Sequence, residues 1–149
     1  MQKYEVTVAD NGDITWYQNG KLHRLDGPAL ERVDGDKFWY QNGKLHRLDG
    51  PAIEEYLNGD KAWYQNGLLH RLDGPAIEYL NGDKFWFQNG LLHRLDGPAI
   101  EYANGKCSWY IADVKYSEVE FNQKINPPKE MTVAELEKIL GYPIKIVKD

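Results

Sequence analysis

Short runs of alternating apolar and polar residues, separated by glycine-containing turns, recur along most of the chain. In one unit the stretch 77–80 is followed by Asn81-Gly82-Asp83 and then by the aromatic stretch 84–87. Two β-prone runs around Asn-Gly predict a β-hairpin with a type I′ turn, which needs positive φ at both central residues. Five turns of this kind predict five hairpins: Asn11-Gly12, Asp34-Gly35, Asn58-Gly59, Asn81-Gly82 and Asn104-Gly105.

The hairpin pattern belongs to an internal repeat marked by tryptophan. Five tryptophans recur at spacings of 23, 24, 23 and 23 residues: Trp16, Trp39, Trp63, Trp86 and Trp109. Each of the first four opens the string Trp-aromatic-Gln-Asn-Gly-x-Leu-His-Arg-Leu-Asp-Gly-Pro-Ala, of which 12 of the 14 positions are identical in all copies. The single longer spacing comes from an extra glutamate in the stretch 53–56, which predicts a β-bulge or a longer loop.

A repeat of this size cannot bury a hydrophobic face alone, so neighbouring copies must stack on one another. The sequence therefore predicts an all-β repeat fold over residues 1–112, an elongated single-layer antiparallel sheet of about five tandem β-hairpins. The string from His to Ala would connect one hairpin to the next. Its Asp would accept a hydrogen bond from a backbone N–H two residues on, and its His would also satisfy backbone groups.

The chain after the last repeat has a different pattern and predicts a small α/β C-terminal cap over residues 113–149. A capping box at Ser117 predicts a short helix through about Ile125, and a second at Thr132 predicts another that ends at Gly141. The alternating residues 144–148 predict a final strand. Repeat arrays need such caps for solubility, and a docking module for a partner is the alternative interpretation.

The composition of the chain argues against two classes of binding partner, nucleic acids and membranes. Lys+Arg 18 against Asp+Glu 23 gives a net charge of -5, which argues against a nucleic-acid or anionic-membrane surface. The single Cys107 indicates a free thiol, and no stretch approaches the ~20 apolar residues of a membrane span. We therefore expect a cytoplasmic protein without a membrane contact.

No motif in the sequence predicts an enzyme, a metal site or a cofactor. The histidines of successive copies would lie roughly 10 Å apart on strand spacing, too far to share a metal ion. No Ser-His-Asp order, Cys-His pair or phosphate-binding glycine loop is present. We expect no catalytic residue, no metal and no cofactor.

The 23-residue period, the glycine-punctuated hairpins and the repeated tryptophan resemble MORN (membrane occupation and recognition nexus) repeats over roughly residues 4–110. The glycine follows the tryptophan by four residues instead of three, and His-Arg-Leu-Asp-Gly stands where that family has His-Gly. The form with His-Arg-Leu-Asp-Gly-Pro-Ala resembles a diverged variant of proteins carried by bacteriophages and large DNA viruses. The resemblance implies an elongated β-hairpin scaffold for interactions, and a host-cell cytoplasm if phage-encoded.

Alternation along a strand predicts that each tryptophan and the residue before it point to opposite faces. The tryptophans would then pack with Ile53, Ile77 and Ile100, and the opposite face would carry an exposed apolar ladder beside regularly spaced arginines. The candidate partner- or ligand-binding residues are Phe38, Tyr40, Arg47, Tyr64, Arg71, Phe85, Phe87 and Arg94. The alternative for the arginines is pairing with the glutamates of the same period, Glu31, Glu54, Glu78 and Glu101.

These observations support three functional hypotheses. The first is a non-enzymatic protein that presents an extended surface to another protein, a host protein if the resemblance holds, with inhibition of a host defence factor as the concrete case. The second is a sequestrant that holds an anionic small molecule such as a nucleotide between repeats. The third is a structural or virion scaffold. Open sheet ends also make a homodimer plausible.

Overall fold

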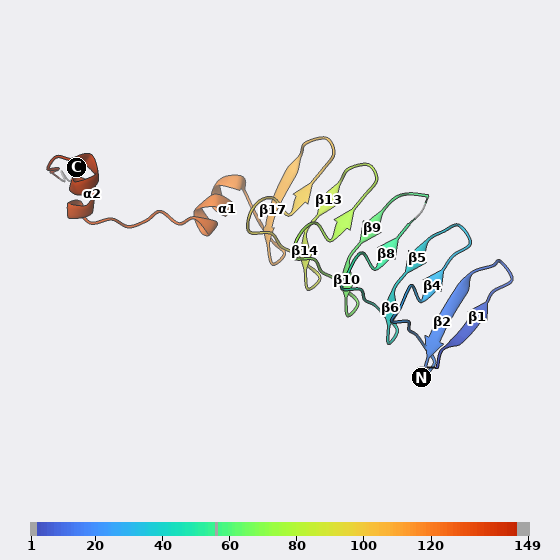
Figure 1. Cartoon of the computed structure of the whole chain (residues 1–149). Helices are drawn as coiled ribbons and strands as arrows, with labels where there is room; N and C mark the ends of the chain where they lie inside the picture. Colours follow the sequence, from blue (N-terminus) through green and yellow to red (C-terminus); the bar gives the residue numbers. More distant parts are fainter. Residues whose placement is uncertain (1–2, 56, 146–149) are drawn as a thin grey trace.

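A computed structural model describes residues 3–55 and 57–145, and it shows a long antiparallel sheet built from tandem hairpins (Figure 1). The strands follow one another in the order β1-β2-β4-β5-β8-β9-β12-β13-β16-β17-β18, with β3 paired to β2. Their bounds are β1 Glu5–Val8, β2 Ile14–Gln18, β3 Lys21–Leu22, β4 Leu30–Glu31, β5 Lys37–Phe38, β8 Ile53–Glu54, β9 Lys61–Ala62, β12 Ile77–Glu78, β13 Lys84–Phe85, β16 Ile100–Glu101, β17 Cys107–Ile111 and β18 Val114–Tyr116. The all-β repeat architecture predicted from the sequence is confirmed.

A second row of short hairpins lies along one edge of this sheet (Figure 1). Their strands are β6 Tyr40–Gln41 with β7 Lys44–Leu45, β10 Tyr64–Gln65 with β11 Leu68–Leu69, and β14 Phe87–Gln88 with β15 Leu91–Leu92. The backbone joins neighbours in this row as well, because Gly67 N–H donates to the Leu45 carbonyl at 2.8 Å. Each repeat thus contributes one hairpin to each row.

The two rows use two different turns, which corrects the turn type predicted from the sequence. At the predicted turn 81–82 only Gly82 has positive φ, and Gly82 N–H donates to the Tyr79 carbonyl. The type I′ conformation occurs instead in the Gln-Asn-Gly segment, where Asn66 and Gly67 have φ of 53° and 83°. The five long hairpins are confirmed, whereas the prediction missed the short hairpins, because it treated Gln-Asn-Gly as part of a longer string.

The extra residue of the third repeat is accommodated in a longer loop and not in a bulge. Ile53 pairs with Ala62 and Glu54 with Lys61, so the ladder of β8 and β9 continues without interruption. Glu55 N–H then donates to the Asp60 carbonyl, which closes the enlarged turn. Of the two sequence-based alternatives, the structure selects the longer loop.

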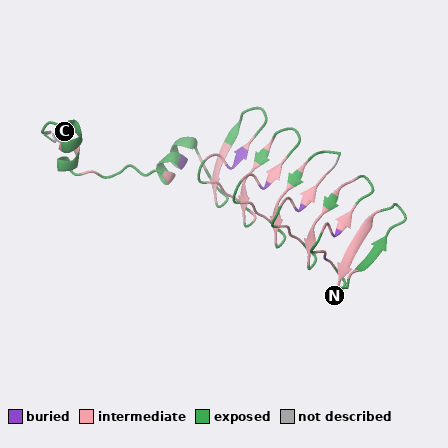
Figure 2. Ribbon diagram, viewed as in Figure 1, coloured by how far each residue is buried: buried purple, intermediate pink, exposed green. Residues whose placement is uncertain are grey.

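Alanines fill the narrow space between the two rows. The alanine of each Gly-Pro-Ala string is 0% exposed, in four copies: Ala29, Ala52, Ala76 and Ala99. Ala76 N–H donates to the Phe85 carbonyl, and its own carbonyl accepts from Trp63 N–H, both at 2.8 Å. Figure 2 shows few other buried positions, so the molecule has a thin interior and no deep core.

The strand is interrupted at Trp39, Trp63 and Trp86, and these interruptions overturn the predicted assignment of faces. Phe38 is opposite Leu30 and Ile53 in the long sheet, so these three side chains share one face. Phe85 is likewise opposite Ile77, and its ring makes T-shaped contacts with Tyr79 and Tyr102. Both phenylalanines are half-buried with the isoleucines, because alternation does not continue from the long sheet into the short hairpin.

The C-terminal segment forms two helices, α1 Glu118–Ile125 and α2 Val133–Leu140. Both predicted capping boxes are present, at Ser117 and Thr132, and Gly141 ends α2 with a φ of 76°. Helix α1 contacts β17 and β18 and buries Phe121, so it covers the last hairpin. In Figure 1 an extended segment separates α1 from α2.

The predicted final strand falls on residues 144–148. Ile144 and Lys145 are not in a strand, and the rest of the stretch lies outside the described residues. No described helix has the length and apolar character that crossing a membrane requires.

Candidate binding surface

Each of the first four repeats contains a unit of the same side chains around its arginine. In the third copy, Arg71 Nε donates to Asp73 Oδ1 at 2.9 Å and Arg71 Nη1 donates to Glu78 Oε1 at 2.8 Å. The same Nη1 donates to the Pro75 carbonyl at 3.2 Å, and the guanidinium carbon lies 3.9 Å from the centre of the Trp63 ring. The unit recurs around Arg24, Arg47 and Arg94.

Glycine after the aspartate leaves room for this arrangement of the guanidinium. A Cβ added to Gly74 would lie 2.9 Å from Arg71 Cζ, closer than real Cβ contacts allow. The guanidinium therefore lies close to both an indole ring and the bare backbone of the glycine. The repeated Asp-Gly pair is thus explained by packing as well as by turn formation.

The arginine units change the interpretation of Arg47, Arg71 and Arg94. Each guanidinium is paired with two carboxylates, as the glutamate-pairing alternative predicted, so each unit carries a net charge of about −1 at neutral pH. The aspartates accept from these arginines. The predicted bond from a backbone N–H two residues on is wrong, because that residue is a proline and has no N–H. These charges do not favour an anion.

The histidines join neighbouring repeats through the backbone. His46 Nδ1 accepts from Asn66 N–H at 3.1 Å, and His70 Nδ1 accepts from Asn89 N–H at the same distance. This confirms the expectation that the histidines satisfy backbone groups, and no group of three metal-ligating side chains occurs in residues 3–55 and 57–145.

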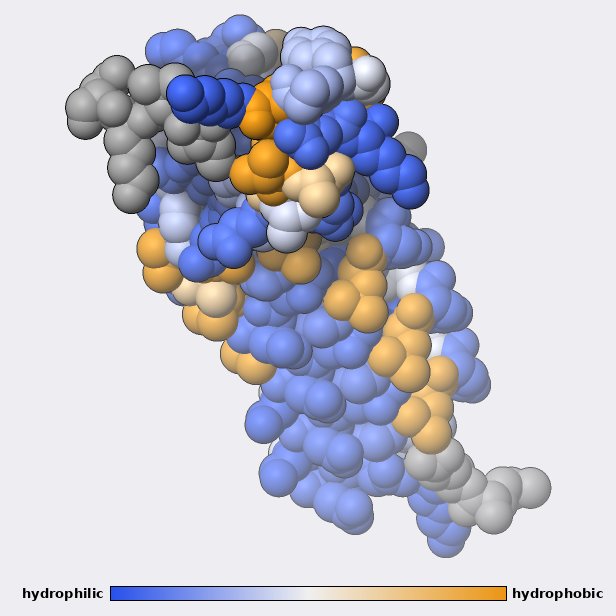
Figure 3. Space-filling view, turned by 90° about the vertical axis from the view of Figure 1, so that its left-hand side faces the viewer, coloured by the Kyte–Doolittle hydropathy of each residue, from blue (hydrophilic) through white to orange (hydrophobic). Residues whose placement is uncertain are grey.

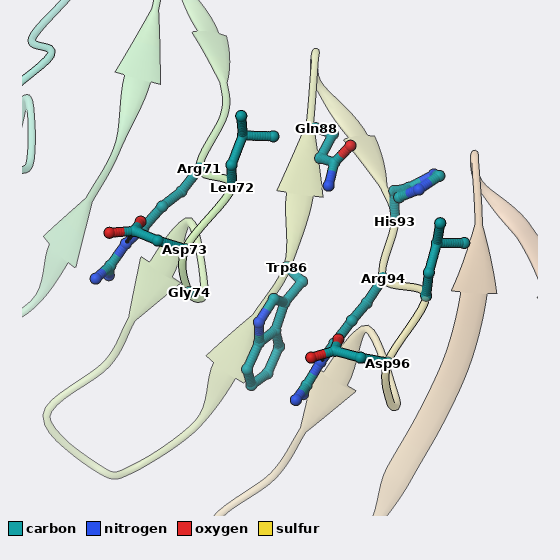
Figure 4. A pocket seen from close by; sticks show the side chains of 10 residues that line it. Arg71, Leu72, Asp73, Gly74, Trp86, Gln88, His93, Arg94 and Asp96 are labelled. Atoms are coloured by element: carbon teal, nitrogen blue, oxygen red, sulfur yellow. Dashed lines mark hydrogen bonds and ion pairs between the residues drawn. The ribbon is translucent and has the colours of Figure 1, made fainter.

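Three equivalent cavities lie between successive arginine units, and we call them the bays. Their volumes are about 480, 500 and 510 Å³ from the first bay to the third. Figure 4 shows the third bay, in which Trp86 lies between the segment Arg71-Leu72-Asp73-Gly74 and the next Arg94-Leu95-Asp96 segment. Gln88 and His93 complete its lining. The equivalent residues of the preceding copies line the other two bays.

No protein-family model matches this chain, and no curated protein matches it. The surface must therefore be interpreted from its own geometry.

The bays include only part of the predicted site. Arg47, Arg71 and Arg94 line them, whereas the aromatic candidates do not. Phe38 and Phe85 lie in the long sheet, and the remaining aromatics pair with leucines inside the short hairpins: Tyr40 with Leu45, Tyr64 with Leu69 and Phe87 with Leu92. Burial raises the pKa of the Tyr64 hydroxyl. The structure thus separates the arginines from the aromatic ladder.

Sequence reasoning missed the leucines at the rim of the bays. The leucine of each Arg-Leu-Asp string is exposed, most of all Leu48 at 76% and Leu72 at 75%. A signal was present, because a turn that needs Asp and Gly has no need for a large apolar residue before them. Figure 3, a view from the side of the C-terminal helices, shows apolar residues arranged in rows along the molecule.

The aspartates of the arginine units predict a small contribution to the acid sensitivity of the fold. The hydrogen bond from the neighbouring arginine holds the pKa of Asp49, Asp73 and Asp96 below its usual value. A folded-state pKa below the unfolded one gives stability that is present above the unfolded value and lost as pH falls through the folded one. Because these aspartates are 84–86% exposed and solvent screens their ion pairs, we expect them to add only a small fall in Tm as pH drops below about 4. Asp49→Asn/Asp73→Asn/Asp96→Asn should show a smaller fall, and an equal fall in both proteins would contradict this assignment.

Proposed function

We propose that the chain is a non-enzymatic repeat protein that binds another protein along its row of bays. The observation that carries this proposal is the repetition of an equivalent concave site, each with an exposed leucine at its rim. Linked weak contacts at equivalent sites raise the apparent affinity without any one of them being strong. A catalytic site, by contrast, normally occurs once.

The paired arginines favour a protein over an anionic small molecule. A nucleotide held between repeats would have to compete with Asp73 and Glu78 for Arg71, and with the equivalent carboxylates for the other arginines. A protein can cover the exposed leucines without displacing any of these ion pairs. A thermal-shift measurement with millimolar nucleotides should therefore leave the Tm unchanged.

The resemblance to MORN repeats of bacteriophages and large DNA viruses indicates which kind of partner to propose. On that basis we propose a host protein, with inhibition of a host defence factor in the host cytoplasm as the specific case. A bacterial lysate is then the appropriate source for the first binding experiment.

Two exposed leucine pairs on different sides of the repeat give a matched test. Leu48→Ser/Leu72→Ser removes the rim of the bays, while Leu57→Ser/Leu80→Ser removes leucines of 73% and 71% exposure in the long-hairpin turns. Both variants should keep the Tm of the wild-type chain, because exposed side chains contribute little to stability.

The measurement is quantitative mass spectrometry of proteins captured from lysate by the immobilised wild-type chain and both variants. We expect a partner that the wild type and the Leu57/Leu80 variant capture equally and that the Leu48/Leu72 variant captures at least about fivefold less. Equal loss in both variants, or no protein above the resin background, would refute the proposal.

A further inference from the structure

The spacing of the bays matches one particular peptide conformation. Each repeat adds two strands to the sheet, and strands lie 4.7–4.9 Å apart, so successive bays are about 9.6 Å apart. A polyproline II helix has three residues per turn and rises about 9.3 Å per turn. Residues three apart on such a helix point in the same direction, so one turn corresponds to one bay.

Other regular conformations fit this spacing less well. Residues three apart on a β-strand span about 9.9 Å but point to opposite sides. Residues seven apart on an α-helix share a face but span about 10.5 Å. This span exceeds the distance between bays by roughly 1 Å, and the mismatch accumulates from one bay to the next. The repeat distance therefore favours the polyproline II conformation.

The lining of the bays suits proline in particular. An indole ring lines each bay, Trp86 in the third, with Arg94 stacked on the ring at 4.0 Å, and the exposed leucines at the rim add apolar contacts. Each bay also contains the side-chain amide of one half-buried glutamine: Gln41, Gln65 and Gln88. A polyproline II peptide has no internal hydrogen bonds and presents carbonyls that such amides can donate to.

The rim of each bay also selects the charge of the ligand. Asp49, Asp73 and Asp96 are 84–86% exposed at the rim. The glutamates of the same units lie opposite lysines in the long sheet, as Glu78 does with Lys61 and Lys84, so the aspartates are the carboxylates open to a ligand. A basic side chain on every third residue would reach one carboxylate per turn. The complementary ligand is positively charged.

We propose that the bays bind a proline-rich, basic segment of the partner in the polyproline II conformation, with one turn per repeat. This inference rests on the protein-binding function proposed above and specifies the chemistry of the partner.

The experiment is a fluorescence-anisotropy titration of the full chain with a labelled peptide of four Arg-Pro-Pro triplets. Two control peptides separate the contribution of peptide charge from that of peptide conformation. Arg-Gly-Gly triplets keep the charge and its spacing but not the polyproline II conformation. Glu-Pro-Pro triplets keep the conformation but carry the opposite charge. We expect each control to bind at least about tenfold more weakly than Arg-Pro-Pro. Raising the salt from about 0.05 to 0.5 M should also weaken binding, because the carboxylates are exposed.

The leucine variants connect the peptide to the bays. Leu48→Ser/Leu72→Ser should weaken Arg-Pro-Pro binding at least about fivefold, while Leu57→Ser/Leu80→Ser should leave it unchanged. Equal affinity for Arg-Pro-Pro and Arg-Gly-Gly, or no binding at about 1 mM peptide, would overturn the inference. If a captured protein still depends on Leu48 and Leu72 in that case, only the peptide chemistry is wrong and the proposed function stands.

Discussion

Replacing Ala76 by leucine is expected to destabilise the chain by about 1–3 kcal/mol. The alanine is fully buried between the two rows of hairpins, and its backbone N–H and carbonyl both bond to neighbouring strands. Three additional carbon atoms have no space there, so the strands would have to separate and break hydrogen bonds in a buried position. Chemical unfolding followed by tryptophan fluorescence measures the loss directly.

A surface alanine provides the matched control. Ala103 is exposed in the last long-hairpin turn, where the equivalent positions of two earlier repeats carry Leu57 and Leu80. Ala103→Leu should change the free energy of unfolding by less than about 0.5 kcal/mol. Similar losses in the two variants would show that leucine is harmful in any repeat and that the narrow interior is not the reason.

Hydrogen exchange should locate the damage in the Ala76 variant. In an array whose repeats contact only their neighbours, stability is roughly a sum of local terms, so one repeat can open before the rest. We expect amides of β12 and β13 to lose protection first, and those of β1 and β2 to be least affected. Uniform loss along the array would instead indicate a single cooperative unit.

The hairpin repeat could be predicted from the sequence because its period and turn residues are local signals. The same local rule failed on turn type, since both Asn81-Gly82 and Asn89-Gly90 contain the pair that favours a type I′ turn. Only the second adopts it, because it connects strands by a two-residue turn, while the first lies in a wider loop in which Asn81 Oδ1 accepts from Asp83 N–H. Loop length is set by strand pairing, which the identity of the turn residues does not determine.

Only the charged pairs of the candidate site could be predicted from the sequence. The period shared by arginine and glutamate indicated their pairing, and Arg71 with Glu78 shows it. The exposed aromatic ladder was wrong because it assumed one continuous strand through Trp39, whereas β5 ends before this residue and β6 begins after it. The bays arise between repeats, so no pattern within a single repeat could indicate them.

Replacing Arg71 by methionine is the second large effect that we expect, with a loss of about 2–4 kcal/mol. The guanidinium is one-fifth exposed and combines a contact with Trp63, a bond to the Pro75 carbonyl and an ion pair with Glu78. Its pair with the largely exposed Asp73 contributes little because solvent screens it. Methionine keeps much of the apolar contact but leaves the carbonyl and the glutamate without a donor.

Lysine at the same position separates charge from geometry. Arg71→Lys keeps the positive charge, but a single ammonium cannot stack on the indole and reach Pro75 and Glu78 together, so about 1–3 kcal/mol should still be lost. The control is Arg32→Met, since Arg32 also lies over a ring, that of Phe38, but is 47% exposed and pairs with Asp36 at 3.7 Å. This control should cost less than about 1 kcal/mol. Full stability of Arg71→Lys would mean that charge alone maintains the unit, and the stacked geometry that shapes the bays would then not be needed for folding.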